Sequence, residues 1–116
     1  MRALLLCLGM GFTLAVSAQP IAYVANEKSG TLSLIDTARD AVIGEIRVGT
    51  KPRGMAVSRD GRRLYVSDQP NNALVVVDLE KRAVEARIEL GESPEGVSLS
   101  PDGLWAIVRG TDNVVV

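Results

Sequence analysis

The chain repeats itself at an interval of 42 residues. The stretch KPRGMAVSRDGRRLYV at residues 51–66 is followed at residues 93–108 by SPEGVSLSPDGLWAIV. When residues 22–61 are compared with residues 64–103 without a gap, 13 positions are identical, and these are mostly glycine, proline, aspartate and β-forming residues. Because such residues define turns and strands, the repeat predicts one supersecondary unit that is written more than once.

Four short apolar runs alternate with turn signals inside one copy. Each run is rich in Val, Leu, Ile or Tyr, so we expect strands at residues 54–58, 63–67, 73–78 and 84–90. The pairs Asp60-Gly61 and Asp102-Gly103 predict tight hairpins, because glycine accepts the positive φ that such turns require. Four antiparallel strands in a period of roughly 40–45 residues are typical of a β-propeller blade. The predicted fold class is therefore all-β, a β-propeller of about two and a half blades, with repeats at about 21–61, 62–103 and a truncated 104–116.

Two short motifs carry a resemblance to a known family. Residues 23–26 read YVAN, one substitution away from the tetrapeptide that names the YVTN β-propeller repeats, and residues 65–68 read YVSD. The pattern P-x-G-[MV]-x-[VL]-S-x-D-G follows in both copies. The chain thus resembles the YVTN repeat proteins, and with its N-terminal segment it looks closest to the PQQ-dependent catabolism-associated β-propellers. This resemblance implies an exported propeller that accompanies periplasmic quinoprotein alcohol dehydrogenases.

The N-terminal segment has the layout of a secretory signal peptide. Arg2 precedes an uncharged apolar run that extends to Val16, and the small residues Ser17 and Ala18 follow. We expect cleavage after Ala18, which makes residues 1–18 the signal peptide and 19–116 a periplasmic or secreted domain. An uncleaved membrane anchor is the alternative, but the run is shorter than the roughly 20 residues that span a bilayer. We therefore expect no stable membrane span after cleavage.

The composition argues against several classes of function. The formal net charge is −1, with dispersed charges, so nucleic acid is not an expected partner. The chain has no histidine, and its one cysteine, Cys7, lies in the predicted signal peptide. Without the commonest general base and metal ligand, we expect no catalytic residue, no metal site and no bound cofactor.

Antiparallel strands return to the same two ends of a blade, so the strand order predicts which loops lie together. The loops at 26–30, 49–54, 68–72 and 91–96 should share one end. The candidate ligand-binding residues in these loops are Asn26, Lys51, Arg53, Asp68 and Glu95. Other repeated residues are expected to shape turns, and these are Pro52, Gly54, Gly61, Pro94, Gly96 and Gly103.

Two sets of carboxylates have a structural interpretation. Asp36 and Asp78 end equivalent runs and are expected to accept hydrogen bonds from the backbone of the next turn rather than to bind metal. Glu92 and Glu95 resemble a catalytic pair, but Thr50 and Arg53 stand at the equivalent places one copy earlier. A catalytic pair therefore is not predicted.

Two functional hypotheses follow. The first is a non-catalytic binding or scaffold module, whose partner is a periplasmic quinoprotein dehydrogenase system or a small molecule. The alternative is the N-terminal fragment of a propeller enzyme or cofactor carrier, such as a quinoprotein dehydrogenase, a lactonase or a haem propeller, with its active residues downstream. In either case, about two and a half blades leave uncovered faces, so we expect self-association when the chain is expressed alone.

Overall fold

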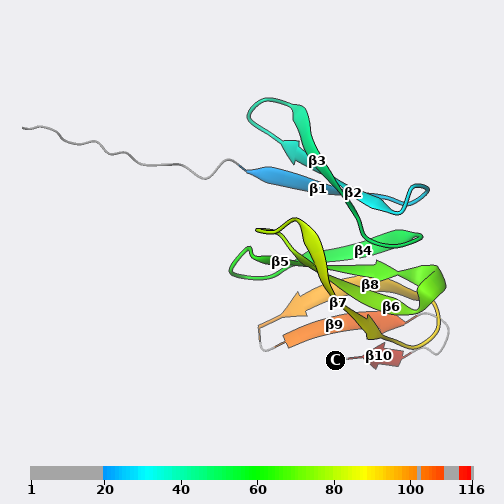
Figure 1. The fold of residues 1–116 in the computed structure, drawn as a ribbon. Coiled ribbons are helices and arrows are strands. Elements are labelled where there is room, and N and C mark those ends of the chain that lie inside the picture. The colour runs from blue at the N-terminus through cyan, green and yellow to red at the C-terminus, as the bar shows by residue number, and fades with distance from the viewer. Residues whose placement is uncertain (1–19, 102, 109–112, 116) are drawn as a thin grey trace, which may run out of the picture.

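A computed structural model describes residues 20–101, 103–108 and 113–115 of the chain. The predicted signal peptide, its cleavage site and the truncated end of the third repeat at Val116 lie outside the described residues. The described part consists of short strands and one 3₁₀ turn (Figure 1). The elements are β1 (Ile21–Asn26), β2 (Thr31–Asp36), β3 (Ala41–Arg47), β4 (Pro52–Val57), β5 (Arg63–Asp68), η2 (Gln69–Asn71), β6 (Ala73–Asp78), β7 (Ala83–Glu89), β8 (Pro94–Ser100), β9 (Gly103–Val108) and β10 (Asn113–Val115).

The strands form three antiparallel sheets in chain order. The first sheet is β1-β2-β3, the second is β4-β5-β6-β7, and the third is β8-β9-β10. The sheets follow one another like stacked blades, with β4 of the second beside β8 of the third (Figure 1). Each strand predicted for the complete copy is confirmed to within two residues at either end. The all-β prediction is therefore confirmed, and the short turn η2 is the one described element that the apolar runs did not indicate.

The repeat extends to irregular features of the backbone. The register between β2 and β3 shifts after Leu34, and the register between β6 and β7 shifts after Val76, which is the equivalent residue 42 positions later. The left-handed conformation recurs at Asp40 and Arg82, with φ of 52° and 54°. A bulge bends its strand and increases the local twist. The first two blades therefore have the same backbone irregularities, although many of their side chains differ.

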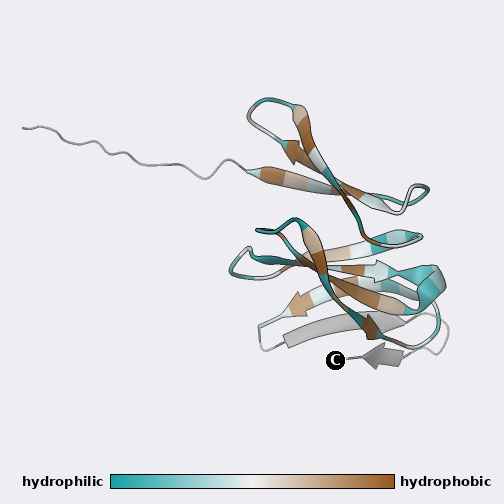
Figure 2. Cartoon of the chain, in the orientation of Figure 1, coloured by the Kyte–Doolittle hydropathy of each residue, from teal (hydrophilic) through white to brown (hydrophobic). Residues whose placement is uncertain are grey.

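The hydrophobic core lies between the first and second sheets. The first sheet and its following residue contribute Leu32, Leu34, Ile46 and Val48, and the second contributes Leu64, Val66, Val75 and Val77. These side chains alternate along their strands, as a period of two requires. Figure 2 shows the same pattern, with hydrophobic strands and hydrophilic connections at both ends. The apolar face of one blade is buried only when a second blade packs against it. The core therefore needs at least two copies of the repeat.

The first strands of the second and third sheets, β4 and β8, approach each other closely at the glycine of the P-x-G stretch, which both copies of the repeat contain. A Cβ placed on Gly54 of β4 would collide with the backbone oxygen of Glu95 on β8. Ser67 strengthens the same junction, because it accepts a hydrogen bond from the Gly54 N–H at 2.9 Å and donates one to the Glu95 carbonyl at 2.8 Å. Gly54 was predicted to shape a turn, but its role is to let two blades meet backbone to backbone.

Candidate functional site: an arginine-centred loop cluster

Within each of the first two blades, the loops at one end of the sheet are hydrogen-bonded to each other. The carbonyl of Gly30, in the β1–β2 loop, accepts hydrogen bonds from the backbone N–H groups of Val48 and Gly49 at 2.9 and 3.1 Å. One repeat later, the Leu90 N–H donates to the carbonyl of Asn72 at 2.7 Å. Asn72 and Gly30 are equivalent residues, and both adopt a positive φ. The loops expected to share an end therefore do so.

Arg53 is the centre of the polar groups at this end. Its Nε lies 2.9 Å from Glu27 Oε1, and its Nη1 lies 3.2 Å from Glu95 Oε1. Nη1 also donates to Gln69 Oε1 at 3.3 Å. Gln69 Nε2 in turn donates to the Ser93 hydroxyl at 2.7 Å and to Glu95 Oε1 at 3.1 Å. We call these five residues the Arg53 cluster.

The Arg53 cluster draws on three blades but mainly on two repeat positions. Glu27 and Gln69 are 42 residues apart in equivalent loops, and so are Arg53 and Glu95 at the x of P-x-G. The x residue of the second blade thus contacts the loop residue of the blade before it, the loop residue of its own blade and the x residue of the blade after it. Sequence reasoning found Arg53 and Glu95 but missed Glu27, Gln69 and Ser93, although the 42-residue offset alone relates Glu27 to Gln69.

The charges of the cluster leave it with a slight excess of carboxylate. Arg53 lies between Glu27 and Glu95, so the three ionised groups sum to −1. The Arg53 side chain is 38 % exposed, so solvent screens these pairs. Exposed ion pairs of this kind stabilise a fold by about 0.2–1 kcal/mol each. The cluster is therefore a solvent-facing polar surface whose geometry is held by neighbouring blades, and it can offer both charges to a ligand or partner.

Asp68 lies at the same end but below the surface. It is fully buried, and its carboxylate accepts hydrogen bonds from the N–H groups of Thr50 and Lys51, the latter at 2.9 Å, and from Asn71 Nδ2 at 2.7 Å. The close approach of Asp68 to Gly49 leaves no room for a Cβ there. Asp68 therefore anchors the β3–β4 connection, and this explains its position without a ligand.

Asn26 and Lys51 do not join the cluster through any described side-chain contact. Asn26 Nδ2 donates to the hydroxyl oxygens of Thr31 and Ser33 at 3.1 and 2.8 Å, within its own sheet. Lys51 contributes only its backbone at this end of the sheets, where its N–H donates a hydrogen bond to Asp68 Oδ1. Of the five expected ligand residues, the structure thus brings Arg53 and Glu95 together at the surface.

The residues expected to shape turns have distinct positions. Pro52 and Pro94 are fully buried at the starts of β4 and β8. Gly61 has a φ of 72°, as the hairpin between β4 and β5 predicts. Gly96 lies in β8, where the register to β9 shifts next to it. Gly103 begins β9, while its turn partner Asp102 is outside the described residues.

The aspartates predicted to bind turns do so. Asp36 Oδ1 accepts hydrogen bonds from the backbone N–H groups of Ala38 and Arg39 at 2.9 and 3.2 Å. Asp78 Oδ1 accepts the equivalent bonds from Lys81 and Glu80 at 3.0 and 2.9 Å. These donors, that of Lys81 foremost, hold the pKa of Asp78 below its ordinary value. In the part of the chain that the structure describes, no three His, Cys, Asp or Glu residues gather to hold a metal ion.

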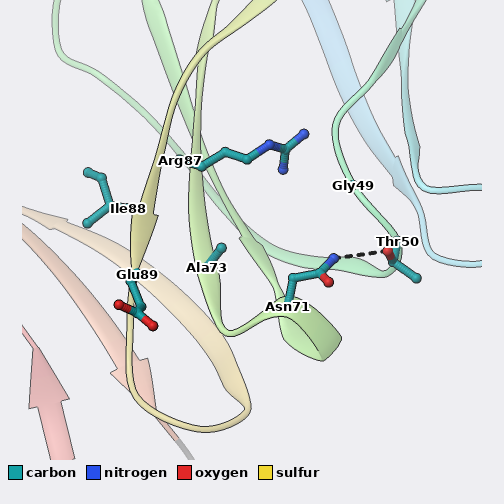
Figure 3. A pocket seen from close by; sticks show the side chains of 7 residues that line it. All are labelled: Gly49, Thr50, Asn71, Ala73, Arg87, Ile88 and Glu89. Atoms are coloured by element: carbon teal, nitrogen blue, oxygen red, sulfur yellow. Dashed lines mark hydrogen bonds between the residues drawn. The ribbon is translucent and has the colours of Figure 1, made fainter.

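An open groove of about 550 Å³ lies beside this end, between the β3–β4 connection and β7. In Figure 3, Arg87 extends toward Gly49, while Ile88 points to the other side of the strand. Arg87 Nη1 donates to the Val48 carbonyl at 2.9 Å, and Asn71 Nδ2 donates to Thr50 Oγ1 at 2.9 Å (Figure 3). These bonds join the two blades, so the groove is an inter-blade seam.

One bidentate ion pair connects strands within the second blade. Arg63 Nε and Nη2 donate to the two carboxylate oxygens of Glu85 at 2.7 and 3.0 Å. This pairing lowers the pKa of the Glu85 carboxyl and raises that of Arg63. The first blade has Ile21 and Ile43 at the equivalent positions. An ion pair in one blade thus replaces an apolar pair in the other.

Solved structures with a similar fold define the class of the chain. Hydrazine synthase of Kuenenia stuttgartiensis matches with a TM-score of 0.69 and 26 % identity over 82 % of this chain. The dihydro-heme d1 dehydrogenase NirN matches with a TM-score of 0.66 and 21 % identity over 82 %, and AztD of Citrobacter koseri with 0.58 and 24 % over 66 %. The β-propeller domain of Swd1 from Myceliophteria thermophila also matches, with a TM-score of 0.63. Together with the stacked four-stranded antiparallel blade, these matches establish the chain as part of a β-propeller.

The extent of the matches is partial. The chain covers 31 % of the hydrazine synthase chain, 20 % of NirN and 23 % of AztD. No protein-family model matches the sequence, and no curated protein matches it. Among the described residues, no helix is long and apolar enough to cross a membrane.

Proposed function

We propose that the chain is an exported, non-catalytic β-propeller module that binds its partner through the Arg53 cluster. The partner we propose is a quinoprotein alcohol dehydrogenase of a periplasmic, PQQ-dependent oxidation system. The resemblance of YVAN and the P-x-G-[MV]-x-[VL]-S-x-D-G pattern to YVTN repeat proteins supports the system, and the signal-peptide layout of residues 1–18 supports export.

The binding role is supported by the way in which three blades together hold the Arg53 side chain in place. Three successive blades each contribute a side chain to Arg53, so its position depends on blade stacking rather than on one mobile loop. Sites held by rigid elements bind with a smaller loss of conformational freedom. The x residue also varies between copies while the flanking proline and glycine do not, which is the pattern of a fixed frame with a changeable surface.

The experiment measures binding of the purified chain to the quinoprotein alcohol dehydrogenase of the source organism by biolayer interferometry. We expect micromolar or tighter binding that weakens at least tenfold in Arg53→Ala, equivalent to about 1.4 kcal/mol. Arg59→Ala is the matched control, because Arg59 is also a surface arginine but belongs to the hairpin at the opposite end, and it should leave binding unchanged. No binding at 100-fold higher concentration, or equal loss in both variants, would contradict the proposal.

Export has a separate test. Mass spectrometry of periplasmic material should find Gln19 as the first residue of the chain. An intact chain that begins at Met1 and stays with the membrane fraction would show that residues 1–18 act as an anchor.

A second candidate is supported by the neighbours themselves. Hydrazine synthase and the dihydro-heme d1 dehydrogenase NirN are enzymes by name, and this chain covers less than a third of either. On this hypothesis, the chain is the N-terminal part of a longer propeller enzyme or cofactor carrier. Sequencing the DNA beyond the codon of Val116 tests it, since continued 42-residue repeats with a histidine or a haem-attachment motif favour the enzyme, and their absence favours the binding module.

A further inference from the structure

The groove between the β3–β4 connection and β7, which we call the seam groove, is lined by one side chain of each charge, Arg87 and Glu89. Across β6 and β7, Arg87 pairs with Val75. In the same way, Glu89 pairs with Ala73. Val75 belongs to the core between the first and second sheets, and directly opposite residues share one face of a sheet. Arg87 and Glu89 therefore face the first sheet, whereas Ile88 points to the other side (Figure 3).

The two charged groups do not neutralise each other. Among the described contacts, Arg87 and Glu89 form no ion pair, and Glu89 has no hydrogen-bond partner. Arg87 Nη1 instead donates to the Val48 carbonyl at 2.9 Å, and its side chain extends across toward Gly49 (Figure 3). Residues two apart on a strand already have Cα atoms roughly 6.6 Å apart. The seam groove therefore holds a cation and a carboxylate that are separated from each other.

Both charges keep binding capacity that their described contacts do not use. A guanidinium has five N–H donors, and Arg87 uses one of them for the Val48 carbonyl. The Thr50 hydroxyl accepts a hydrogen bond from Asn71 Nδ2 and keeps its own proton as a donor. Ala73 is 7 % exposed and adds an apolar surface to the same groove. The groove thus combines donors for an anion, an acceptor for a cation and an apolar contact.

The repeat does not require this pair of charges at the seam. The equivalents of Arg87 and Glu89 in the first blade are Glu45 and Arg47, which carry the opposite signs. Glu45 and Arg47 alternate along the chain with Ile46 and Val48, which are buried in the core toward the second sheet. The first-blade charges therefore point away from the seam groove. They provide matched controls, because they occupy the same strand positions without lining the groove.

We propose that the seam groove binds a linear zwitterion, a molecule whose ammonium group and carboxylate are separated by about two residues of extended chain, roughly 7 Å. The carboxylate binds the remaining N–H donors of Arg87, the ammonium group binds the Glu89 carboxylate, and the chain between them lies on Ala73. Short peptides and ω-amino acids share this chemistry. An α-amino acid does not, because one carbon carries both of its charged groups. The site is separate from the Arg53 cluster, and the proposal does not rest on the partner proposed above.

The first experiment titrates the isotope-labelled full chain with small probes and follows its backbone amide signals by NMR spectroscopy. We expect saturable shifts at Gly49, Thr50 and Ala73 with ε-aminohexanoate and with diglycine. Glycine, hexanoate and hexylamine should each bind at least about threefold more weakly, since each lacks one charge or the spacing, and an exposed ion pair contributes a factor of about this size. Tighter binding of diglycine assigns the groove to peptide ends, and tighter binding of ε-aminohexanoate assigns it to free ω-amino acids.

The second experiment removes one charge at a time. Glu89→Gln should weaken binding of ε-aminohexanoate about threefold to fivefold and leave hexanoate binding unchanged, because only the ammonium group loses its partner. Glu45→Gln is the matched control and should bind as the wild type does. Arg87→Gln should weaken ε-aminohexanoate and hexanoate but not hexylamine. If a thermal melt shows that this variant is unfolded, Arg87→Lys replaces it, since lysine keeps the positive charge but loses the guanidinium fork, and should bind both carboxylates more weakly.

Three results would overturn the proposal. One is the absence of a saturable shift with either zwitterion. Another is binding of glycine or hexanoate as tight as that of ε-aminohexanoate, because the groove would then not read two separated charges. The third is an equal effect of Glu89→Gln and Glu45→Gln, which would show a general response to the charge of the chain instead of a contact in the seam groove.

Discussion

Removing the buried Asp68 carboxylate should destabilise the chain strongly. Asp68 is fully buried and accepts hydrogen bonds from three donors, the N–H groups of Thr50 and Lys51 and the side chain of Asn71. Hydrogen bonds to a charged group contribute about 1.5–3 kcal/mol each, but such contributions overlap within one network. We therefore expect Asp68→Ala to lower the free energy of unfolding by about 3–5 kcal/mol.

The comparison with Asp68→Asn separates charge from hydrogen bonding. The amide keeps one acceptor oxygen for the Lys51 N–H but turns an NH₂ group toward the other donors, so an intermediate loss is expected. Urea denaturation followed by circular dichroism measures both variants, with Asp60→Ala as control, because Asp60 is also hydrogen-bonded but lies exposed in a hairpin. If Asp68→Ala unfolds at the same urea concentration as the wild type, the anchor role of the carboxylate is wrong.

Three further perturbations test other parts of the structure. Gly61→Val should cost about 1–2 kcal/mol purely through the positive φ, since nothing lies within 4 Å of an added Cβ, while Arg59→Ala should be neutral in the same thermal melt. Gly54→Ala should cost about 1–3 kcal/mol through overpacking against β8, and a melting temperature equal to that of the wild type would show that the inner strands separate freely. The pKa of Glu85 is lowered in the folded chain by Arg63, so the stability from this pair is present above the ordinary glutamate pKa and is lost as the pH falls through the folded value. Titration of stability with acid should therefore show a smaller decrease in Arg63→Ile with Glu85→Ile, the pair that the first blade uses, than in the wild type.

The site was partly predictable because the repeat carries part of its geometry. Equivalent residues occupy equivalent places, so the positions of Arg53 and Glu95 at one end followed from strand order. The burial of Asp68 could not be predicted in this way, because the equivalent residue of the first copy is Asn26, which bonds within its own sheet instead. The same repeat position thus has two different sets of partners. Only the side chains of adjacent blades decide between them.

Left-handed backbone conformations show a similar division. Gly30 and Gly61 carry their positive φ in residues that favour it, and Gly61 was expected in this conformation. Arg82 and Ser93 adopt a positive φ without such a signal. For these residues, the bulged pairing and the short connections impose the conformation. Local propensity is too weak to oppose the hydrogen bonds of a whole sheet.

The sequence by itself determined the period, the strands, the hairpins and the stacked antiparallel architecture, because these depend on local alternation and on residues with restricted φ. The tertiary structure alone decided which polar groups meet in the Arg53 cluster, how close β4 comes to β8, and which apolar residues stay exposed. Each of these depends on contacts between blades, where residues 24 to 42 positions apart face one another across a boundary. A one-dimensional pattern indicates that a blade has two faces, and only the packed neighbours determine what each face touches.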